Sequence, residues 1–408
     1  MPYPTRNRAV INRKLSGSGR KASRFGNTQK ISEIFPIHRP IPQCAFFPIK
    51  VDNIWNSKQN EPEISSIKLI ELYRYIGVPR MTLTTVTTVT TVKIHQAGSS
   101  DQLCVEQITI PAPSHDEVRI KQSRIGINFA DIYFRKGLYP MPEMPATLGL
   151  EAIGVIKEAG KNITGFSAGD RVIYAGFPLG GYVTERNIPA QHVIKIPDDL
   201  SDKKVAGTFL RGLTACMLLT ECLSPKASET VLIHAAAGGL GQILVRWAKH
   251  LGLKVIGTVG STEKADLARA LGADHTVLYK QEDFKKAVAR LTNGEGVDYA
   301  IDGIGGDNLL KTIQSTKPFG VTMSIGQIAG NVAPIPPELL KNRFLIRPSI
   351  LALLSDNDRY HRLANQWFDF ARQSNFAAAS EYNLSDVKQA HDDLEAGRSA
   401  GSIVLRTD

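Results

Sequence analysis

The segment that most constrains the fold of this chain is "HAAAGGLGQILVRWAKHLG", His234 to Gly252. The residues before it, Val231 to Ile233, form a short aliphatic run that is typical of a buried parallel strand. After the glycines, apolar residues recur with the spacing of one helical face. They are Leu240, Ile243, Leu244, Trp247, Ala248 and Leu251. The segment therefore predicts a strand that passes directly into a helix through a turn of nearly bare backbone.

A turn of this kind suits a phosphate group. Glycines let the backbone approach a pyrophosphate, and the start of the helix offers N–H groups without partners and the positive end of its dipole. The match to the dinucleotide-binding pattern Gly-x-Gly-x-x-Gly is imperfect, because Ala236 takes the first glycine position, ahead of Gly238 and Gly241. Ala236 fits there only if its φ is negative. Small residues could instead serve close packing of a helix on a strand, so the flanking sequence has to decide.

The flanking sequence favours the nucleotide site. Strand-like and helix-like patterns alternate from this turn to Gly326, which predicts a doubly wound parallel sheet. We therefore expect an α/β fold with a Rossmann domain over residues 211–346.

The end of the second strand, "KVIGTVG", indicates which dinucleotide binds. NAD-binding proteins usually place Asp or Glu there, where it accepts hydrogen bonds from the ribose 2′-hydroxyl. This chain has Gly260 and Ser261 instead, with Lys264 one turn into the next helix. Lys264 could be an ordinary solvated lysine, but no carboxylate is present to repel a 2′-phosphate. The pattern predicts NADP(H) as the cofactor.

The preceding half of the body has a different character. Between about residues 90 and 205, short strand patterns are separated by Gly, Pro and Asp turns, which indicates a partly open, barrel-like β domain. The expected substrate site is a cleft between this domain and the nucleotide domain.

The basic charge of the chain belongs to an N-terminal extension. The whole chain has a formal net charge of +10. Residues 1–80 contain 14 Lys and Arg against 5 Asp and Glu, whereas the remaining residues contain 35 Lys and Arg against 34 Asp and Glu. A nucleic-acid groove would spread basic residues through the fold, so we expect none in the body. Residues 1–32 have eight basic and no acidic residues, the composition of a transit peptide. The extension could also be a native basic tail, with a helical pattern over residues 64–77, or it could precede a true start at Met81.

No apolar run reaches the roughly 20 residues that a transmembrane helix needs. We therefore expect no membrane insertion. The expected location is cytoplasmic, or mitochondrial if residues 1–32 act as a transit peptide.

Several segments of the body resemble one family. "INFADIYFRKGLYP", "LGLEAIGVIKEAG", "IHAAAGGLGQILVRWAKHLG" and "GTVGSTEKADLARALGADH" follow in the order found in the zinc-independent, zeta-crystallin-like quinone oxidoreductases of the medium-chain dehydrogenase/reductase superfamily. The resemblance runs from about Lys93 to the C-terminal "SIVLRTD". It implies a GroES-like catalytic domain over residues 81–210, to which the chain returns over residues 347–408, and a homodimer.

The resemblance also implies roles for individual residues. Tyr133 and Tyr139 would face the substrate, although packing alone could account for both, and Asn128 would contact the nicotinamide side of the cofactor. Further cofactor contacts would be Gly238, Gly239, Leu240, Gly241, Gly260, Ser261, Lys264, Tyr279, Ser324, Gly326, Gln327, Phe344, Ile346, Arg347 and Arg398. Met217 and Gly303 stand where the family often has a tyrosine and a serine, so no cofactor contact is predicted for them.

Zinc-dependent relatives carry a Cys ligand, a Gly-His-Glu pair and a lobe with four closely spaced cysteines. Here Leu150 stands in place of the histidine, and Glu151 remains without partners. The four cysteines form no Cys-x-x-Cys pair. Because zinc needs three or four converging ligands, we predict no metal site.

Without a metal, the chemistry would depend on the cofactor and on hydrogen-bond donors. We predict NADPH-dependent reduction of quinones in the interdomain cleft. Reduction of activated C=C bonds in enones or enals would use the same parts and stays open. The alternative of another class is an RNA-binding or structural, crystallin-like protein. Against it, few aromatic residues interleave with the basic extension and no RNA-binding motif appears.

Overall fold

The computed structural model describes residues 86–141, 143–374, 376 and 378–407. The chain divides into two units, Met1–Arg80 and Met81–Asp408, and all the described residues belong to the second. The predicted transit peptide over residues 1–32, the helical pattern over residues 64–77 and the start at Met81 lie outside the described residues.

Six parallel strands form the sheet of the α/β half of this unit. Their order, β11-β10-β9-β12-β13-β14, is 3-2-1-4-5-6 in chain order, which is that of a doubly wound dinucleotide-binding fold. The strands are Thr230–Ile233 (β9), Lys254–Val259 (β10), His275–Leu278 (β11), Val297–Asp302 (β12), Thr316–Ser324 (β13) and Phe344–Ile346 (β14). The helices that follow the first four are Gly239–His250 (α5), Thr262–Ala270 (α6), Phe284–Leu291 (α7) and Gly306–Gln314 (α8). The predicted fold class is confirmed.

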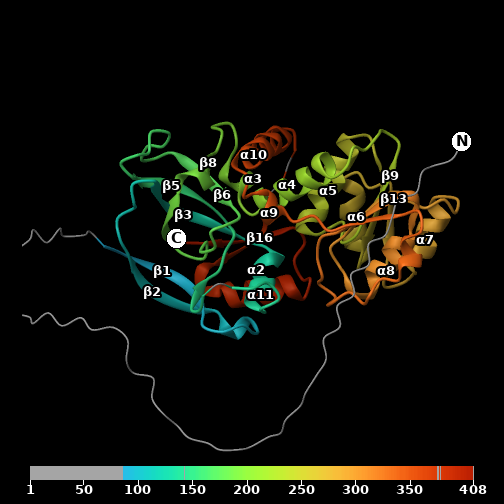
Figure 1. The fold of residues 1–408 in the computed structure, drawn as a ribbon, viewed down its shortest axis with the longest axis horizontal. Coiled ribbons are helices and arrows are strands. Elements are labelled where there is room, and N and C mark those ends of the chain that lie inside the picture. The colour runs from blue at the N-terminus through green and yellow to red at the C-terminus, as the bar shows by residue number, and fades with distance from the viewer. Residues whose placement is uncertain (1–85, 142, 375, 377, 408) are drawn as a thin grey trace, which may run out of the picture. The chain divides into compact units, whose positions relative to one another are not determined.

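Two mostly antiparallel sheets form the β-rich half. One has the order β2-β1-β4, and the other has the order β15-β16-β3-β5-β6-β8, with β7 paired to β3. The strands are Thr87–Ile94 (β1), Cys104–Ile110 (β2), Glu117–Ile127 (β3), Ala146–Thr147 (β4), Glu151–Ala159 (β5), Arg171–Ala175 (β6), Glu185–Pro189 (β7), Val193–Lys195 (β8), Ala378–Asn383 (β15) and Ser402–Arg406 (β16). Strand β16 pairs antiparallel with β3, so the C-terminal segment comes back to the first strands (Figure 1).

The remaining helices belong to the β-rich half or connect the halves. They are Phe129–Arg135 (α2), Asp202–Val205 (α3), Phe209–Cys216 (α4), Ile350–Leu353 (α9), Asn357–Arg372 (α10) and Val387–Glu395 (α11). Short 3-10 turns span Ser100–Gln102, Ala190–His192, Pro337–Leu340 and Leu384–Asp386, and a π-helical turn spans Met217–Glu221. None of the helices in the described ranges is long and apolar enough to cross a bilayer.

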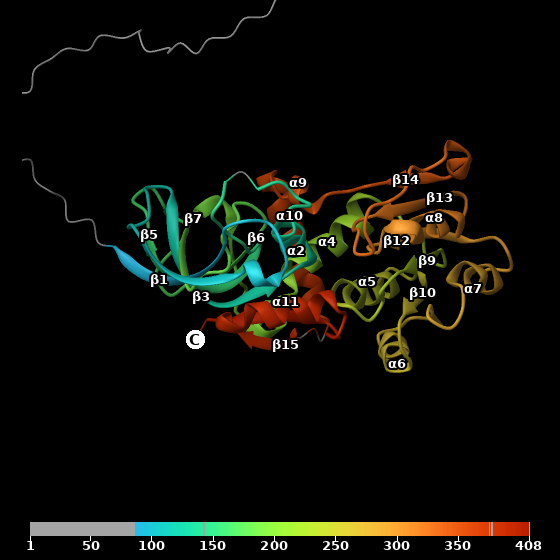
Figure 2. The same ribbon diagram turned by 90° about the horizontal axis from the view of Figure 1, so that it is seen from below.

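Helices α4, α5 and α10 join the two halves, and both ribbon views show α4 and α5 between the two groups of strands (Figure 2). The ring of Trp247 on α5 stacks on Phe370 of α10, with ring centres 4.4 Å apart. A Cβ on Gly212 of α4 would lie 2.2 Å from the ring of Trp367 on α10, so only glycine allows the two helices to approach this closely. Aromatic packing of this kind buries much apolar surface and holds the two walls of the cleft in one arrangement.

Candidate cofactor and substrate cleft

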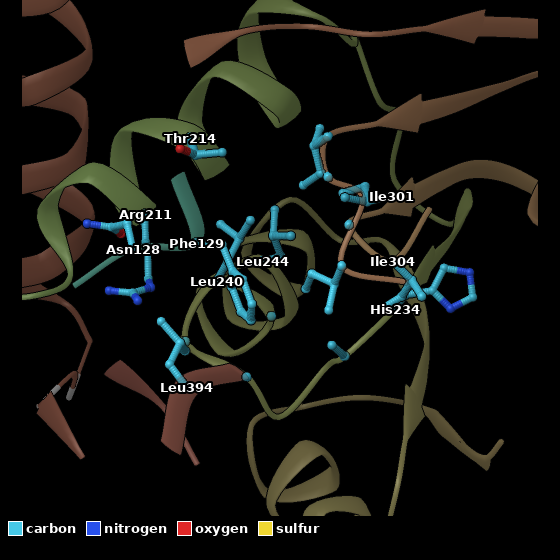
Figure 3. A pocket seen from close by; sticks show the side chains of 18 of the residues that line it. Asn128, Phe129, Arg211, Thr214, His234, Leu240, Leu244, Ile301, Ile304 and Leu394 are labelled. Atoms are coloured by element: carbon cyan, nitrogen blue, oxygen red, sulfur yellow. The ribbon is translucent and has the colours of Figure 1, made fainter. Parts of the chain in front are cut away.

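A cavity of about 900 Å³ lies where the two halves meet. Figure 3 shows Asn128 and Arg211 on one side of it, Leu240 of α5 in the middle, and Ile304 and His234 on the other side. The cavity lies outside the carboxyl ends of β9 and β12, the two neighbouring strands at which the strand order reverses. This crevice is where ligands bind in open α/β sheets.

The first turn of α5, directly after β9, presents backbone amides that no side chain caps, whereas the Gly238 N–H donates to the Ala235 carbonyl oxygen at 2.8 Å. Helix α5 begins at Gly239 with Gly238 as its N-cap, at a φ of −77°, and no side chain caps its first turn. The positive φ in this turn belongs to Ala235, at 52°, and not to Ala236. Ala236 therefore has the negative φ that an alanine needs at the first glycine position of the pattern. A Cβ on Gly241 would lie 2.2 Å from the Ala235 carbonyl oxygen, so glycine is needed for the helix to begin this close to the turn. Uncapped N–H groups at a helix start bind anions such as a pyrophosphate.

A second part of the cavity follows strands β10 and β11. Its lining residues are Gly260, Ser261, Lys264, Tyr279 and Lys280, two of which are basic and none acidic. The Ser261 hydroxyl caps α6 by accepting a hydrogen bond from the Lys264 backbone N–H at 3.4 Å. The Lys264 ammonium donates to the Gly397 carbonyl oxygen, a neutral partner, at 2.9 Å. This end of the cavity therefore suits a phosphate group.

The opposite end is aromatic and includes Tyr133. The Tyr133 ring packs edge-on against Tyr139, with ring centres 5.2 Å apart, and its hydroxyl oxygen accepts a hydrogen bond from the Gln327 backbone N–H at 2.9 Å. Burial raises the pKa of Tyr133, and the nearby Arg347 guanidinium offsets part of that rise. The hydroxyl thus keeps its proton at neutral pH. Because its oxygen already accepts from Gln327, that proton is free to be donated to another group.

Asn128 is held beside the cavity by two buried carboxylates. Its side-chain amide donates to Glu151 at 3.2 Å, and its backbone N–H donates to Asp131 at 2.7 Å. Burial, together with the Glu151 charge, raises the pKa of Asp131 to about 7, and burial also raises the pKa of Glu151. The Tyr182 hydroxyl lowers the pKa of Asp131, although Oδ1 of Asp131 has no partner within hydrogen-bonding geometry. Glu151 thus fixes the Asn128 side chain and Asp131 fixes its backbone, and neither carboxylate lines the cavity.

Arg211 supplies the positive charge that balances this pair. Its guanidinium lowers the pKa of both Glu151 and Asp131, and it donates to the Ile127 carbonyl oxygen at 2.6 Å. A Cβ on Gly239 would lie 2.7 Å from its Nε. Arg211 therefore connects the buried carboxylates of the β-rich half to the first turn of α5.

The structure gathers most of the predicted site residues in the cavity wall. Those that line it are Asn128, Tyr133, Tyr139, Gly238, Gly239, Leu240, Gly241, Gly260, Ser261, Lys264, Tyr279, Ser324, Gly326 and Arg347. Gln327, Phe344, Ile346 and Arg398 are not among the lining residues. Gln327 still contacts the wall through Tyr133, whereas Arg398 forms an ion pair with Asp393 at 2.6 Å and Phe344 is 54% exposed. The predicted roles of all these residues stay predictions.

The sequence interpretation did not include several lining residues. Arg211 and Lys280 line the cavity, as do Met217 and Gly303, for which no contact was predicted. A signal for Arg211 was present in "FLRGLTACMLL", because a charged side chain within an apolar helix needs a buried partner. Its partners lie in distant segments of the chain, so the pattern indicates that Arg211 needs a buried partner but does not indicate which residue that partner is.

Comparisons with known proteins identify the family. Residues 114–198 match the alcohol dehydrogenase GroES-like domain, and residues 239–366 match the zinc-binding dehydrogenases. A 2-haloacrylate reductase from a Burkholderia species is 38% identical over 324 residues, which cover 76% of this chain and 97% of that protein. Quinone oxidoreductase 1 of Escherichia coli (strain K12) is 33% identical over 321 residues, which cover 77% of this chain and 98% of that protein. The chain belongs to the quinone oxidoreductase family of the medium-chain dehydrogenase/reductase superfamily.

A solved structure agrees with this assignment. The crystal structure of Escherichia coli quinone oxidoreductase complexed with NADPH is similar at a TM-score of 0.75 and 33% identity, and the match covers 78% of this chain and all of that one. The predicted family is confirmed.

The residues present do not fit the zinc ion that one matched family is named for. Both oxygens of Glu151 already accept hydrogen bonds, from the Asn128 amide at 3.2 Å and from the Phe209 backbone N–H at 3.1 Å. Leu150 beside it is fully buried and offers no donor atom. Across the described ranges, no three His, Cys, Asp or Glu side chains gather so that they could hold a metal ion. Arg211, a fixed cation, balances the carboxylate that would otherwise need one.

Proposed function

We propose that this protein uses NADPH to reduce quinones in the interdomain cleft. The observation that carries the proposal is one cavity with uncapped amides at the start of α5, two lysines and no acid among the residues that line it beside Gly260, and a proton-bearing tyrosine at the other end. The reaction is quinone + NADPH + H⁺ → hydroquinone + NADP⁺.

The residues present fit NADP(H). The N–H groups of Gly239, Leu240 and Gly241 would hold the pyrophosphate, and Lys264 with Lys280 would hold the 2′-phosphate. When bound, the cofactor supplies a hydride. The relatives support this choice, since the Escherichia coli quinone oxidoreductase structure contains NADPH.

The chain's own residues would position the acceptor and manage charge. Asn128, fixed by Glu151 and Asp131, would orient the nicotinamide side of the site. Tyr133 would donate its free proton to the oxygen on which negative charge develops, and its buried setting strengthens that bond. Tyr139 holds the Tyr133 ring from its edge and adds apolar surface for a flat acceptor.

A second candidate is reduction of activated C=C bonds. The 38% identity to a 2-haloacrylate reductase favours it, and it would use the same cavity. A panel of quinones and enones, with the loss of NADPH absorbance as the measurement on the full chain, tests both. Rapid reduction of a simple quinone with NADPH is expected. Reduction of enones alone would replace the first proposal with the second.

We also propose a homodimer and a cytoplasmic location. The outer strand β14 leaves Phe344 54% exposed on a sheet edge, which is a surface suited to pairing. Sedimentation of the purified protein tests the first proposal. Cell fractionation tests the second against the mitochondrial alternative.

A further inference from the structure

Arg347 is a cation of the cavity wall that has no acidic partner in the described ranges. Arg211 faces the Glu151 and Asp131 carboxylates. Arg347 instead donates only to neutral groups, the Ser324 hydroxyl at 3.3 Å and the Gln327 side-chain carbonyl at 3.2 Å, and it forms no ion pair with any carboxylate in the described ranges. A guanidinium has five N–H groups, so three remain available in the cavity wall.

At the proposed sites, the phosphates of NADP(H) would lie too far away to bind Arg347. It follows β14, whereas the amide turn follows β9 and the two lysines follow β10 and β11. Neighbouring strands are about 4.8 Å apart, so three strand spacings place the pyrophosphate turn roughly 14 Å away, and four place Lys264 roughly 19 Å away. The nicotinamide end of the cofactor carries no further phosphate. Arg347 therefore stays unpaired even with the cofactor bound.

Arg347 belongs instead to the acceptor end of the cavity. It holds the side chain of Gln327, whose backbone N–H donates to the Tyr133 hydroxyl. Ile328, Ile350 and Leu351 line the cavity with it and offer apolar surface to a flat acceptor, while the Arg347 side chain itself is exposed and open to an incoming anion. The single acidic residue among those that line the cavity, Glu395, is already paired with Arg135 and Lys136.

We propose that Arg347 binds an anionic group on the electron acceptor, so that the preferred substrates are flat, conjugated acceptors that carry a carboxylate or another oxyanion. This inference rests on the proposed function and names its substrate class. A carboxylate or sulfonate fits the forked N–H groups of an arginine. With its anion on Arg347, such an acceptor would have its reducible group next to the Tyr133 proton.

The test compares two acceptors that differ in charge, naphthoquinone and naphthoquinone sulfonate, in the full chain with NADPH. The quantity of interest is the ratio of kcat/KM for the sulfonate to kcat/KM for the neutral quinone. Arg347→Gln should lower this ratio roughly tenfold or more, since charge-assisted hydrogen bonds of this kind are each worth about a factor of ten. Arg347→Lys should recover part of it.

Two control variants separate this effect from a general loss of positive charge. Lys286→Gln removes a charge from the exposed face of α7, and Lys280→Gln removes one from the other end of the cavity. Both should keep the wild-type ratio. An equal loss on both quinones in Arg347→Gln would overturn the proposal, as would an equal drop of the ratio in Lys286→Gln.

A binding measurement keeps the inference testable if neither quinone is reduced. Isothermal titration of naphthoquinone sulfonate into the protein saturated with NADP⁺ requires no turnover. Weaker binding to Arg347→Gln than to wild type, by roughly tenfold, supports the anion site even if the proposed reaction is wrong. Equal affinity of naphthoquinone sulfonate for wild type and Arg347→Gln would overturn the proposed anion site.

Discussion

The Lys264 ammonium donates a hydrogen bond to the Gly397 carbonyl oxygen at 2.9 Å. This contact joins helix α6 of the α/β half to the segment that follows α11 in the β-rich half. Since a carbonyl is a weaker partner than a phosphate, Lys264 is available to exchange it for the 2′-phosphate of NADPH.

Replacing Lys264 by Gln should therefore weaken the binding of NADPH more than the binding of NADH. We expect the ratio of kcat/KM for NADPH to that for NADH to fall roughly tenfold or more, because a charge-assisted hydrogen bond is lost with only one cofactor. Steady-state kinetics with both cofactors checks this. Lys286→Gln, on exposed α7, is the matched control and should keep the wild-type ratio. An unchanged ratio in Lys264→Gln would mean that this lysine does not read the 2′-phosphate.

A carboxylate at Gly260 should reverse the cofactor preference. In Gly260→Asp the new side chain would accept from a ribose 2′-hydroxyl and repel a 2′-phosphate. Its Cβ would lie 3.0 Å from the Tyr279 hydroxyl, the far end of a half-exposed side chain that can shift. The NADPH-to-NADH ratio should fall roughly a hundredfold, since like charges at contact cost several kcal/mol. Gly260→Asn adds nearly the same bulk without charge, and a comparable fall there would show that bulk and not charge is responsible.

The two cleft tyrosines should differ in their effect on turnover. Tyr133→Phe removes a hydroxyl that accepts from Gln327 and has a free proton, so kcat for a quinone should fall roughly tenfold to a hundredfold. Tyr139 contributes ring packing against Tyr133 and Phe134, and Tyr139→Phe keeps those rings. It should lower kcat less than Tyr133→Phe does. Equal losses in the two variants would contradict a proton-donating role for Tyr133.

The buried Asp131 should make stability depend on pH. Its pKa is raised from 3.8 to about 7 in the folded protein, so the folded state keeps a proton that the unfolded chain releases. The stability that this proton contributes is complete below about pH 4 and is lost as the pH rises through about 7, with a slope of at most about 1.4 kcal/mol per pH unit.

Asp131→Asn removes this titration while it keeps an oxygen for the Asn128 N–H. The free energy of unfolding of the variant minus that of wild type should therefore increase as the pH rises from about 5 to about 8, as measured by urea unfolding at both pH values. Asp358→Asn, at an exposed position on α10, is the control and should track wild type. A constant difference between Asp131→Asn and wild type at the two pH values would contradict the prediction.

Local patterns predicted the α/β half well. The strand, the glycine turn and α5 follow from residues within about 20 positions of each other, and the absence of an acid after β10 is equally local. The return of β16 to β3 pairs Ile403 with Ile127. No periodicity connects segments so far apart in the sequence, so this return was predicted only from the family resemblance.

The buried charges could not be placed by the same reasoning. Arg211 stands in an apolar segment, which indicates that it needs a buried partner. Its partners Glu151 and Asp131 come from β5 and α2, far away in the sequence. Arg398 is predicted to contact the cofactor, and the turn after α11 also pairs it with Asp393, a partner that the sequence pattern did not indicate. In both cases the tertiary arrangement decides which charge meets which.

A crystal structure of the full chain with NADP⁺ tests the proposed cofactor site most directly. We predict the pyrophosphate against the backbone amides of Gly239 to Gly241 and the 2′-phosphate within hydrogen-bonding distance of Lys264, with the nicotinamide between Asn128 and Tyr133. A dinucleotide bound elsewhere, or a cleft that stays closed to it at saturating concentration, would contradict this site.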